Sequence, residues 1–185
     1  MRIFLIVLLV LSIFIVFTVP TFYEAHVEHT VLTVSREVAS DLIWARSTSI
    51  KTGKDYGVVF IMGGEPGYHV FLDKNGNGKF DASDIVARTV EFKDINKHVK
   101  FSGAFDDKGV VFTDNTFIFR GDGKLDQTGT AGYDSVFIIN DSDERKGIME
   151  RTIRVYVDRS NNDIQILMVT GKTDDGDIIF GEIIS

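Results

Sequence analysis

The chain has 185 residues, 27 of them acidic and 20 basic, which gives a net charge of −7. This acidic balance argues against a nucleic-acid-binding surface, because affinity for nucleic acid depends on neutralising phosphates. The sequence contains no cysteine, which excludes disulfide bonds, thiolate metal sites and a thiol nucleophile.

The N-terminal stretch from Ile3 to Val19 has no charged side chain and is closed by Pro20. It is near the lower limit for a helix that crosses the hydrocarbon core of a bilayer, which needs about 17–25 residues. Lipid or similar helices are expected to surround it, since no other segment is long enough to wrap it in water. Arg2 precedes the stretch and Glu24 follows it, which favours a cytoplasmic N-terminus.

Three interpretations of this stretch compete. A cleaved signal peptide would need a small-residue site, and Ala25 has Tyr23 two residues before it, which makes a poor site. A plain membrane anchor is the second interpretation, and an anchor that continues as a long helix outside the membrane is the third. Pro20 should end or kink the apolar helix, but the helical pattern then resumes, which favours the third.

The resumed pattern predicts one buried and one solvated helix face. The buried face comprises Val27, Val31, Val34, Val38, Leu42, Ala45 and Ser49. The expected solvated face comprises Glu28, Arg36, Glu37, Asp41 and Arg46. Lys51 and Gly53 form a C-terminal stop signal. If both parts are helical they extend for about 75 Å, so half of the helix must project from any small domain.

After Gly53 the hydrophobic period changes to two, which predicts an antiparallel sheet of short strands joined by turns rich in Gly, Asn and Asp. The predicted strands are Tyr56–Met62, Tyr68–Leu72, Val86–Phe92, His98–Phe101, Thr116–Phe119, Val136–Asn140, Thr152–Asp158, Ile164–Thr170 and Ile178–Ile184.

The chain resembles the minor pilins and pseudopilins of bacterial type IV pili and type II secretion, specifically the H-type pseudopilins. The resemblance begins with an apolar helix that ends at Val19-Pro20. The run from Asp41 to Gly53, DLIWARSTSIKTG, then resembles the helix-end pattern D-L-x-x-A-R-x-x-A-I-x-x-G of that family. An Asp/Asn/Gly loop, a late strand at Arg151–Val155 and an apolar strand ending at Thr170-Gly171-Lys172 follow in the family's order.

This resemblance implies an α+β, pilin-like fold in which a long N-terminal helix packs on an antiparallel β-sheet head. The implied organisation is a transmembrane anchor at residues 1–20, an amphipathic extension at 21–53 and a β-rich head at 54–185. The implied function is that of a structural subunit, not an enzyme, in a type II secretion system or type IV pilus. It would lie in the bacterial inner membrane with a periplasmic head, and its partners would be lipid, other pilin subunits and secreted cargo, without nucleic acid.

Two features of the family have no counterpart in this sequence. The family carries a leader that ends in Gly, followed by a Phe-Thr-Leu-Ile-Glu-like start. With Pro20 on the family's proline, the glutamate position falls near Ile3. Either the natural start lies upstream or the subunit is not processed, and N-terminally methylated, in the usual way. An unpaired charge in lipid is costly. A helix that lacks the family's glutamate is therefore expected to be a better membrane anchor and a poorer subunit for polymerisation.

The segment from Asp73 to Asp84 fits the spacing of an EF-hand calcium loop, D-x-[DN]-x-[DN]-G. The candidate oxygen ligands are Asp73, Asn75, Asn77, the Lys79 carbonyl, Asp81 and Asp84. The alternative is a β-hairpin loop whose Asn-Gly turns need positive φ. No cofactor is required by either interpretation, and a bound calcium ion would tie down the hairpin.

Other polar groups are expected to be structural. Gly121–Asp126 is predicted to be a turn, and the acidic clusters at 141–144 and 174–177 to be solvated loops. His26 and His29 are three residues apart, a spacing that can bind metal, but a third ligand is missing. No sequence motif of a hydrolase, metalloprotease or phosphate-binding loop is present.

Two alternative functions come from other classes. One is a membrane-tethered or secreted, calcium-stabilised β-domain that binds a ligand such as a carbohydrate. The other is DNA capture, which some related minor pilins perform through a basic C-terminal region. The corresponding segment here, from Gly171 to Asp177, is acidic, which disfavours DNA capture.

Overall fold

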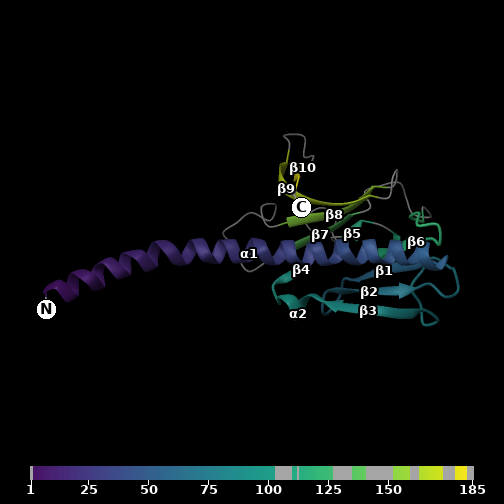
Figure 1. The fold of residues 1–185 in the computed structure, drawn as a ribbon, viewed down its shortest axis with the longest axis horizontal. Coiled ribbons are helices and arrows are strands. Elements are labelled where there is room, and N and C mark those ends of the chain that lie inside the picture. The colour runs from purple at the N-terminus through teal and green to yellow at the C-terminus, as the bar shows by residue number, and fades with distance from the viewer. Residues whose placement is uncertain are drawn as a thin grey trace.

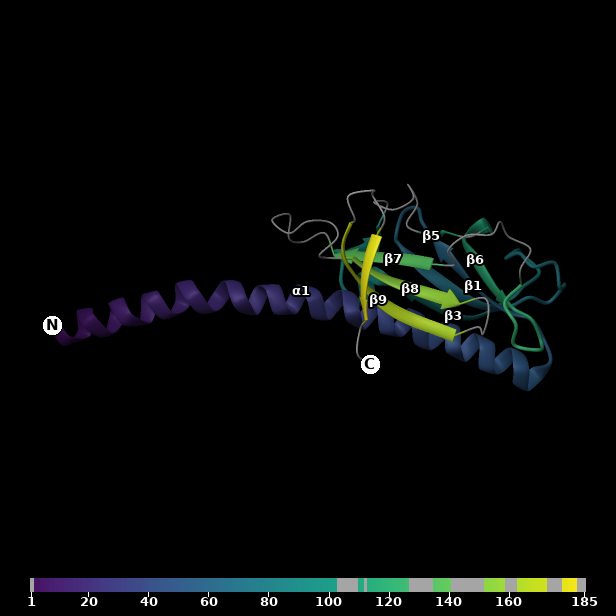
Figure 2. The same cartoon turned by 90° about the horizontal axis from the view of Figure 1, so that it is seen from above.

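The computed structural model describes residues 2–102, 110–111, 113–126, 135–140, 152–158, 163–172 and 178–182. In these residues a long N-terminal helix is followed by two antiparallel sheets, and most of the helix's N-terminal half projects from the head (Figures 1 and 2). This arrangement confirms the predicted α+β class and the antiparallel strand pairing.

Helix α1 (Arg2–Thr52) is continuous over 51 residues, a length of about 75 Å. Its described buried positions begin at Val31 and recur at helical spacing, which confirms the predicted apolar face. They are Val31, Val34, Ser35, Val38, Ala39, Asp41, Leu42, Ala45 and Ser49. Val27 belongs to the predicted face, but its side chain lies outside the described part of the chain.

The two ends of the predicted amphipathic segment behave differently. The helix does not end at Pro20 but continues through it, with a gentle curve in its N-terminal part (Figure 1). A proline removes one backbone donor, and the hydrogen bonds on either side can still carry the helix past it. At the other end, Gly53 has a φ of 66°, and its N–H donates to the Ser49 carbonyl at 2.8 Å. The predicted C-terminal stop is therefore confirmed.

The first sheet, sheet A, has the strand order β3-β2-β1-β6. Its strands are β1 (Tyr56–Ile61), β2 (Gly67–Leu72), β3 (Ile85–Glu91) and β6 (Thr116–Phe119). Strands β2 and β3 pair directly, so residues 73–84 connect the two strands of a hairpin. The short 3-10 turn η1 (Thr113–Asn115) leads into β6.

The second sheet, sheet B, has the order β10-β9-β8-β7-β4, and β5 also pairs with β7. Its strands are β4 (Val99–Phe101), β5 (Val110–Val111), β7 (Ser135–Asn140), β8 (Thr152–Asp158), β9 (Asp163–Lys172) and β10 (Ile178–Glu182). All the described residues of β7 are buried, as expected for a strand in the middle of a sheet.

The core forms where the two sheets and the docked half of α1 meet, because α1 contacts strands of both sheets. Strand alternation supplies the sheet residues, and helical spacing supplies those of α1. The cluster includes Val34, Val38 and Leu42 from α1, Val58, Phe60, Tyr68 and Phe117 from sheet A, and Val136, Ile138, Ile153 and Val155 from sheet B. Each buried aliphatic side chain contributes about 1.5–3 kcal/mol relative to an exposed one.

The predicted strands are confirmed with small changes at their ends. The strand predicted at Val86–Phe92 keeps its length but lies one residue earlier, at Ile85–Glu91, because Phe92 begins the short helix α2 (Phe92–Ile95). The predicted end of the last strand, at 183–184, lies outside the described residues. Strand β5, α2 and η1 were not predicted, since two to four residues are too few to show a period.

Candidate functional site: the helix dock, the 73–84 loop and the exposed helix faces

Asp41, the first residue of the helix-end pattern, docks α1 on sheet A. The residue is 3% exposed, and its carboxylate accepts hydrogen bonds from the Tyr68 hydroxyl at 2.7 Å and from Arg88 Nη1 at 2.5 Å. Arg88 Nη2 also pairs with Glu37 at 2.6 Å. Burial and the neighbouring Asp41 carboxylate raise the pKa of Tyr68 well above its usual range.

The prediction that Asp41 belongs to a solvated face is therefore wrong. Its position borders the buried arc of the helix, and two polar groups of sheet A compensate for its desolvation. Glu37 and Arg46, which were expected on the same solvated face, are half-buried, whereas Arg36 is exposed as predicted. The side chain of Glu28 lies outside the described part.

The arginine of the same pattern, Arg46, reaches the turn that follows β6. Its Nε donates to the Gly123 carbonyl at 3.2 Å, and Gly123 has a φ of 78°. An ideal Cβ on Gly123 would lie 2.4 Å from Ile50 of α1. The turn therefore approaches the helix as closely as a glycine permits. The pattern residues thus fix the helix to the head at two separate places.

The 73–84 loop is organised by two carboxylates. The first is Asp73, only 5% exposed, which accepts Gly76 N–H on Oδ1 at 2.7 Å and Gly78 N–H on Oδ2 at 2.8 Å. Both glycines have positive φ, 69° and 73°. The positive φ expected of the two Asn-Gly turns is therefore confirmed.

The second organising carboxylate is Asp81. Its Oδ2 accepts Asn75 Nδ2 at 2.9 Å and Asn77 Nδ2 at 2.7 Å. Its Oδ1 accepts the Ser83 hydroxyl at 2.6 Å and the Ser83 N–H at 2.7 Å. The hydrogen bonds from Ser83, and then those from the two asparagines, hold the pKa of Asp81 well below its usual range. The carboxylate is therefore ionised at neutral pH.

The two remaining candidate ligand residues, Asp84 and Lys79, also make interactions of their own. Asp84 Oδ1 accepts Lys74 N–H at 3.0 Å, and Asp84 Oδ2 accepts Asp81 N–H at 2.8 Å. Lys79 Nζ pairs with Asp114 of η1 at 3.0 Å. Among the described residues, no three His, Cys, Asp or Glu side chains form a group that could hold a metal ion. Calcium would therefore need Asn75 and Asn77 to turn their amide oxygens inward.

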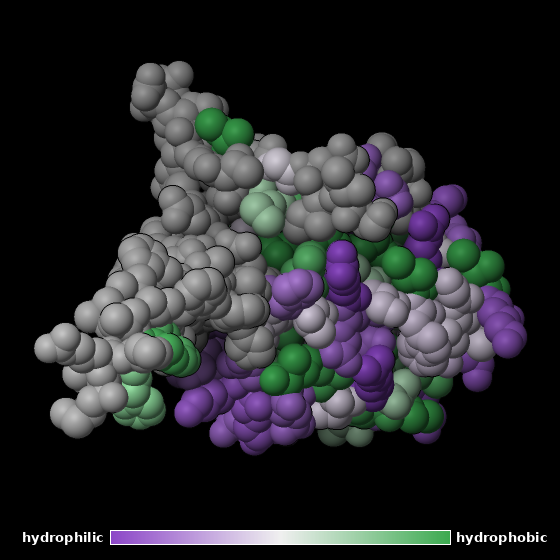
Figure 3. All heavy atoms as spheres, turned by 60° about the vertical axis from the view of Figure 1, so that its left-hand side comes forward, coloured by the Kyte–Doolittle hydropathy of each residue, from purple (hydrophilic) through white to green (hydrophobic). Residues whose placement is uncertain are grey.

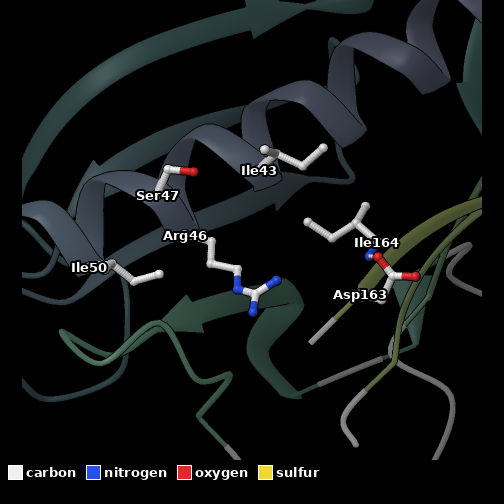
Figure 4. A pocket seen from close by; sticks show the side chains of 6 residues that line it. All are labelled: Ile43, Arg46, Ser47, Ile50, Asp163 and Ile164. Atoms are coloured by element: carbon white, nitrogen blue, oxygen red, sulfur yellow. Dashed lines mark hydrogen bonds between the residues drawn. The ribbon is translucent and has the colours of Figure 1, made fainter. Parts of the chain in front are cut away.

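A shallow pocket of about 170 Å³ lies between the outer face of α1 and the start of β9. Ile43 and Ile164 point toward one another across it, and the Arg46 guanidinium extends into the same space (Figure 4). Ser47, Ile50 and Asp163 complete the lining. The sequence did not indicate this pocket, because it joins residues more than a hundred positions apart.

Several large apolar side chains of α1 are exposed. In the docked half these are Ile43, Trp44 and Ile50. Trp44 is 45% exposed and packs edge-on against Tyr56 at 5.9 Å between ring centroids. In the face of the molecule shown in Figure 3, hydrophobic areas of the described surface are separated by hydrophilic ones.

In the projecting half, the described apolar side chains are Phe4, Val7, Leu8 and Leu11, all more than half exposed. Most side chains of the predicted span Ile3–Val19 lie outside the described part. Where side chains are described, no helix combines the length and apolar character needed to cross a membrane.

The other polar groups are found mostly as structural residues. Gly121–Asp126 forms the predicted turn, with a bridge between Phe119 and Leu125. His29 is exposed, and His69 bonds Thr89 Oγ1 at 2.9 Å. The side chain of His26 and the acidic clusters at 141–144 and 174–177 lie outside the described residues.

The family described as type II transport protein GspH matches residues 34–160, which is more than half of the chain. This chain belongs to the GspH family. Comparison with curated proteins and with solved structures gave no match.

Membership of the GspH family confirms the resemblance to H-type minor pseudopilins of the type II secretion superfamily. The matched region starts at Val34 in the docked half of α1 and ends two residues after β8, so it includes the Asp41 dock, the 73–84 loop and most of the core. Members of this family are structural subunits of the secretion machinery. The residues identified by the geometry fit that role, because they position elements of the fold.

Proposed function

We propose that this GspH-family chain is a membrane-anchored minor pseudopilin that joins its assembly through the projecting half of α1. The supporting observation is the division of one continuous helix into a half that docks on the head and a half that projects from it. Phe4, Leu8 and Leu11 are exposed on the projecting half, where burial in lipid or against other helices is favourable.

In this proposal the two halves of α1 have different tasks. The projecting half holds the subunit in the inner membrane, with Arg2 on the cytoplasmic side and the head in the periplasm. On assembly it packs against the helices of other pseudopilins. The docked half transmits that position to the head through the Asp41 and Arg46 contacts, and the loops of the head set the choice of subunit and cargo contacts.

The absence of cysteine from the sequence permits a direct test. Leu8→Cys places a thiol in the projecting half, and Lys97→Cys places one on the exposed end of the head after α2. After oxidation of host membranes in which partner pseudopilins carry a cysteine in their own apolar N-terminal helices, Leu8→Cys should form mixed disulfides with those helices, whereas Lys97→Cys should not. Release of the chain from the membrane by alkaline carbonate would contradict the proposal.

We further propose that the 73–84 loop binds calcium weakly and is stabilised by it. Support comes from the EF-hand spacing of the candidate ligands and from the bond between Gly78 N–H and Asp73, which produces the sharp turn in mid-loop. Binding would require Asn75 and Asn77 to exchange their bonds to Asp81 for bonds from their oxygens to the ion. The affinity expected for such a site is in the millimolar, extracellular range.

A further inference from the structure

Two Asn-Gly pairs, Asn75-Gly76 and Asn77-Gly78, follow one another in the 73–84 loop, and both asparagines are exposed. Before a glycine, the backbone nitrogen can approach the asparagine side-chain carbon with the least hindrance, because glycine has no Cβ. Asparagine is also among the residues that limit chemical stability. The loop therefore carries two adjacent sites for spontaneous deamidation.

The reaction needs only water as a co-reactant. The glycine nitrogen forms a bond to Cγ of the preceding asparagine and loses its proton. The Cγ–Nδ2 bond breaks, and ammonia leaves with that proton. Water then opens the five-membered imide to give aspartate, or isoaspartate in which the chain continues through the former side chain. Each event replaces a neutral amide by a carboxylate.

The folded loop holds every group of this reaction in another interaction. The attacking nitrogens, Gly76 N and Gly78 N, donate their protons to Asp73 at 2.7 and 2.8 Å. The leaving nitrogens, Asn75 Nδ2 and Asn77 Nδ2, donate to Asp81 at 2.9 and 2.7 Å. Cyclisation requires each amide to turn onto the nitrogen of the next residue, which breaks its bond to Asp81. The alignment of the glycine nitrogen with the asparagine Cγ strongly affects the rate of cyclisation, so the folded loop should slow deamidation.

We propose that Asn75 and Asn77 form a two-step deamidation site that Asp81 holds closed, and that conversion of either asparagine opens the site at the other. Both amides donate to the same oxygen, Asp81 Oδ2. The first conversion replaces one donor by a carboxylate beside that oxygen, and like charges at this distance repel. The loop then releases the second amide. The result is an irreversible change of charge in the β2–β3 hairpin.

The first test uses the full chain in detergent micelles, with a chelator present, at neutral pH and constant temperature. Peptide-resolved mass spectrometry measures the rate of amide-to-acid conversion at each asparagine, in native protein and in protein unfolded by urea. The native rates at Asn75 and Asn77 should be lower by on the order of tenfold or more. Equal or higher rates in the native protein would overturn the proposal.

The second test addresses the coupling between the two sites. Asn75→Asp supplies the carboxylate of the first product, and Asn75→Gln, its matched control, keeps an amide donor at that position. The Asn77 conversion rate should rise several-fold in Asn75→Asp relative to Asn75→Gln. Asp81→Ala should raise the rate at both asparagines, whereas Asp122→Ala, in another acidic turn, should not. Equal Asn77 rates in the two Asn75 variants would overturn the coupling.

Discussion

Asp41 is the residue whose role differs most from its expectation. The helical period places Asp41 beside the buried arc of α1. A carboxylate on a surface helix is normally solvated, so the sequence predicts a solvated side chain at this position. Its partners, Tyr68 and Arg88, lie on two strands of sheet A. No local pattern in the sequence connects residues that distant, which is why the dock could not be predicted.

Removal of the Asp41 carboxylate should destabilise the head substantially. Asp41→Ala leaves the Tyr68 hydroxyl buried without its acceptor and deprives Arg88 of a partner, so the free energy of unfolding should fall by about 2–3 kcal/mol. Glu37→Ala is the matched control, because it removes the second, half-buried partner of the same arginine and should cost less than about 1 kcal/mol. Chemical denaturation of both variants measures the difference, and equal losses would contradict the dock.

The raised pKa of Tyr68 predicts a loss of stability at alkaline pH. The unfolded chain releases the Tyr68 proton at the ordinary tyrosine pKa, whereas the folded chain retains it. The stabilisation is therefore fully present below the ordinary pKa and is lost as the pH rises above it. Tyr68→Phe should flatten the alkaline limb of the curve of stability against pH, measured from denaturant midpoints. A limb of unchanged slope would show that Tyr68 does not cause it.

Substitution of Ser35 is predicted to stabilise the protein, in contrast to substitution of Asp41. The Ser35 side chain is fully buried on the docked face of α1, and its hydroxyl has no hydrogen-bond partner among the described residues. Ser35→Ala removes an unsatisfied polar group and improves helix propensity, so the free energy of unfolding should rise by about 1 kcal/mol or more. Ser40→Ala, on the exposed face, should gain only the propensity part. A loss of stability in Ser35→Ala would mean that the hydroxyl is satisfied.

At the scale of elements, the packing of sheet A depends on Gly57 in β1, one of the two interior strands of that sheet. An ideal Cβ on Gly57 would lie 2.5 Å from Phe71 Cζ and 2.6 Å from Ile118 Cδ1. Both of these side chains are buried, so they cannot easily move aside. Gly57→Ala should lower the unfolding free energy by about 1–3 kcal/mol through overpacking. Gly63→Ala, where the new Cβ would meet nothing within 4 Å, should change it little.

The calcium proposal belongs to the β2–β3 hairpin and makes its own prediction. Millimolar calcium should raise the thermal midpoint of the full chain in detergent, because an ion that binds only the native state stabilises it by mass action. The shift should disappear in Asp84→Ala and should not be reproduced by the same concentration of magnesium. An unchanged midpoint in the wild-type chain would leave the loop as a hairpin connection only.

The strands themselves were largely predictable, because each alternates clearly and is bounded by Gly, Asn or Asp. Strand β8 and strand β6 begin and end where the sequence placed them. The pairing was not predictable. Strand β1 pairs with β6, although β2 to β5 lie between them in the sequence, and β7 joins β4, β5 and β8. Such pairing depends on long-range packing that no local window contains.

At the scale of the whole molecule, the change of hydrophobic period at Gly53 was sufficient to predict a helix followed by a sheet domain. The docking of α1 over residues 31–49 follows from the helical spacing of small and apolar residues, whereas its unbroken course through Pro20 was not predicted. The pocket between α1 and β9 was not predictable, since it exists only once sheet B is assembled beside the helix. Family membership then assigns this architecture to a minor pseudopilin.

The most direct test of the account is the N-terminal sequence and intact mass of the chain extracted from the membranes of its own host. The account predicts that the apolar segment Ile3–Val19 is retained in the mature protein, as a membrane-anchored subunit requires. Cleavage near Ala25, which would release the head as a secreted domain without its projecting helix, would contradict it.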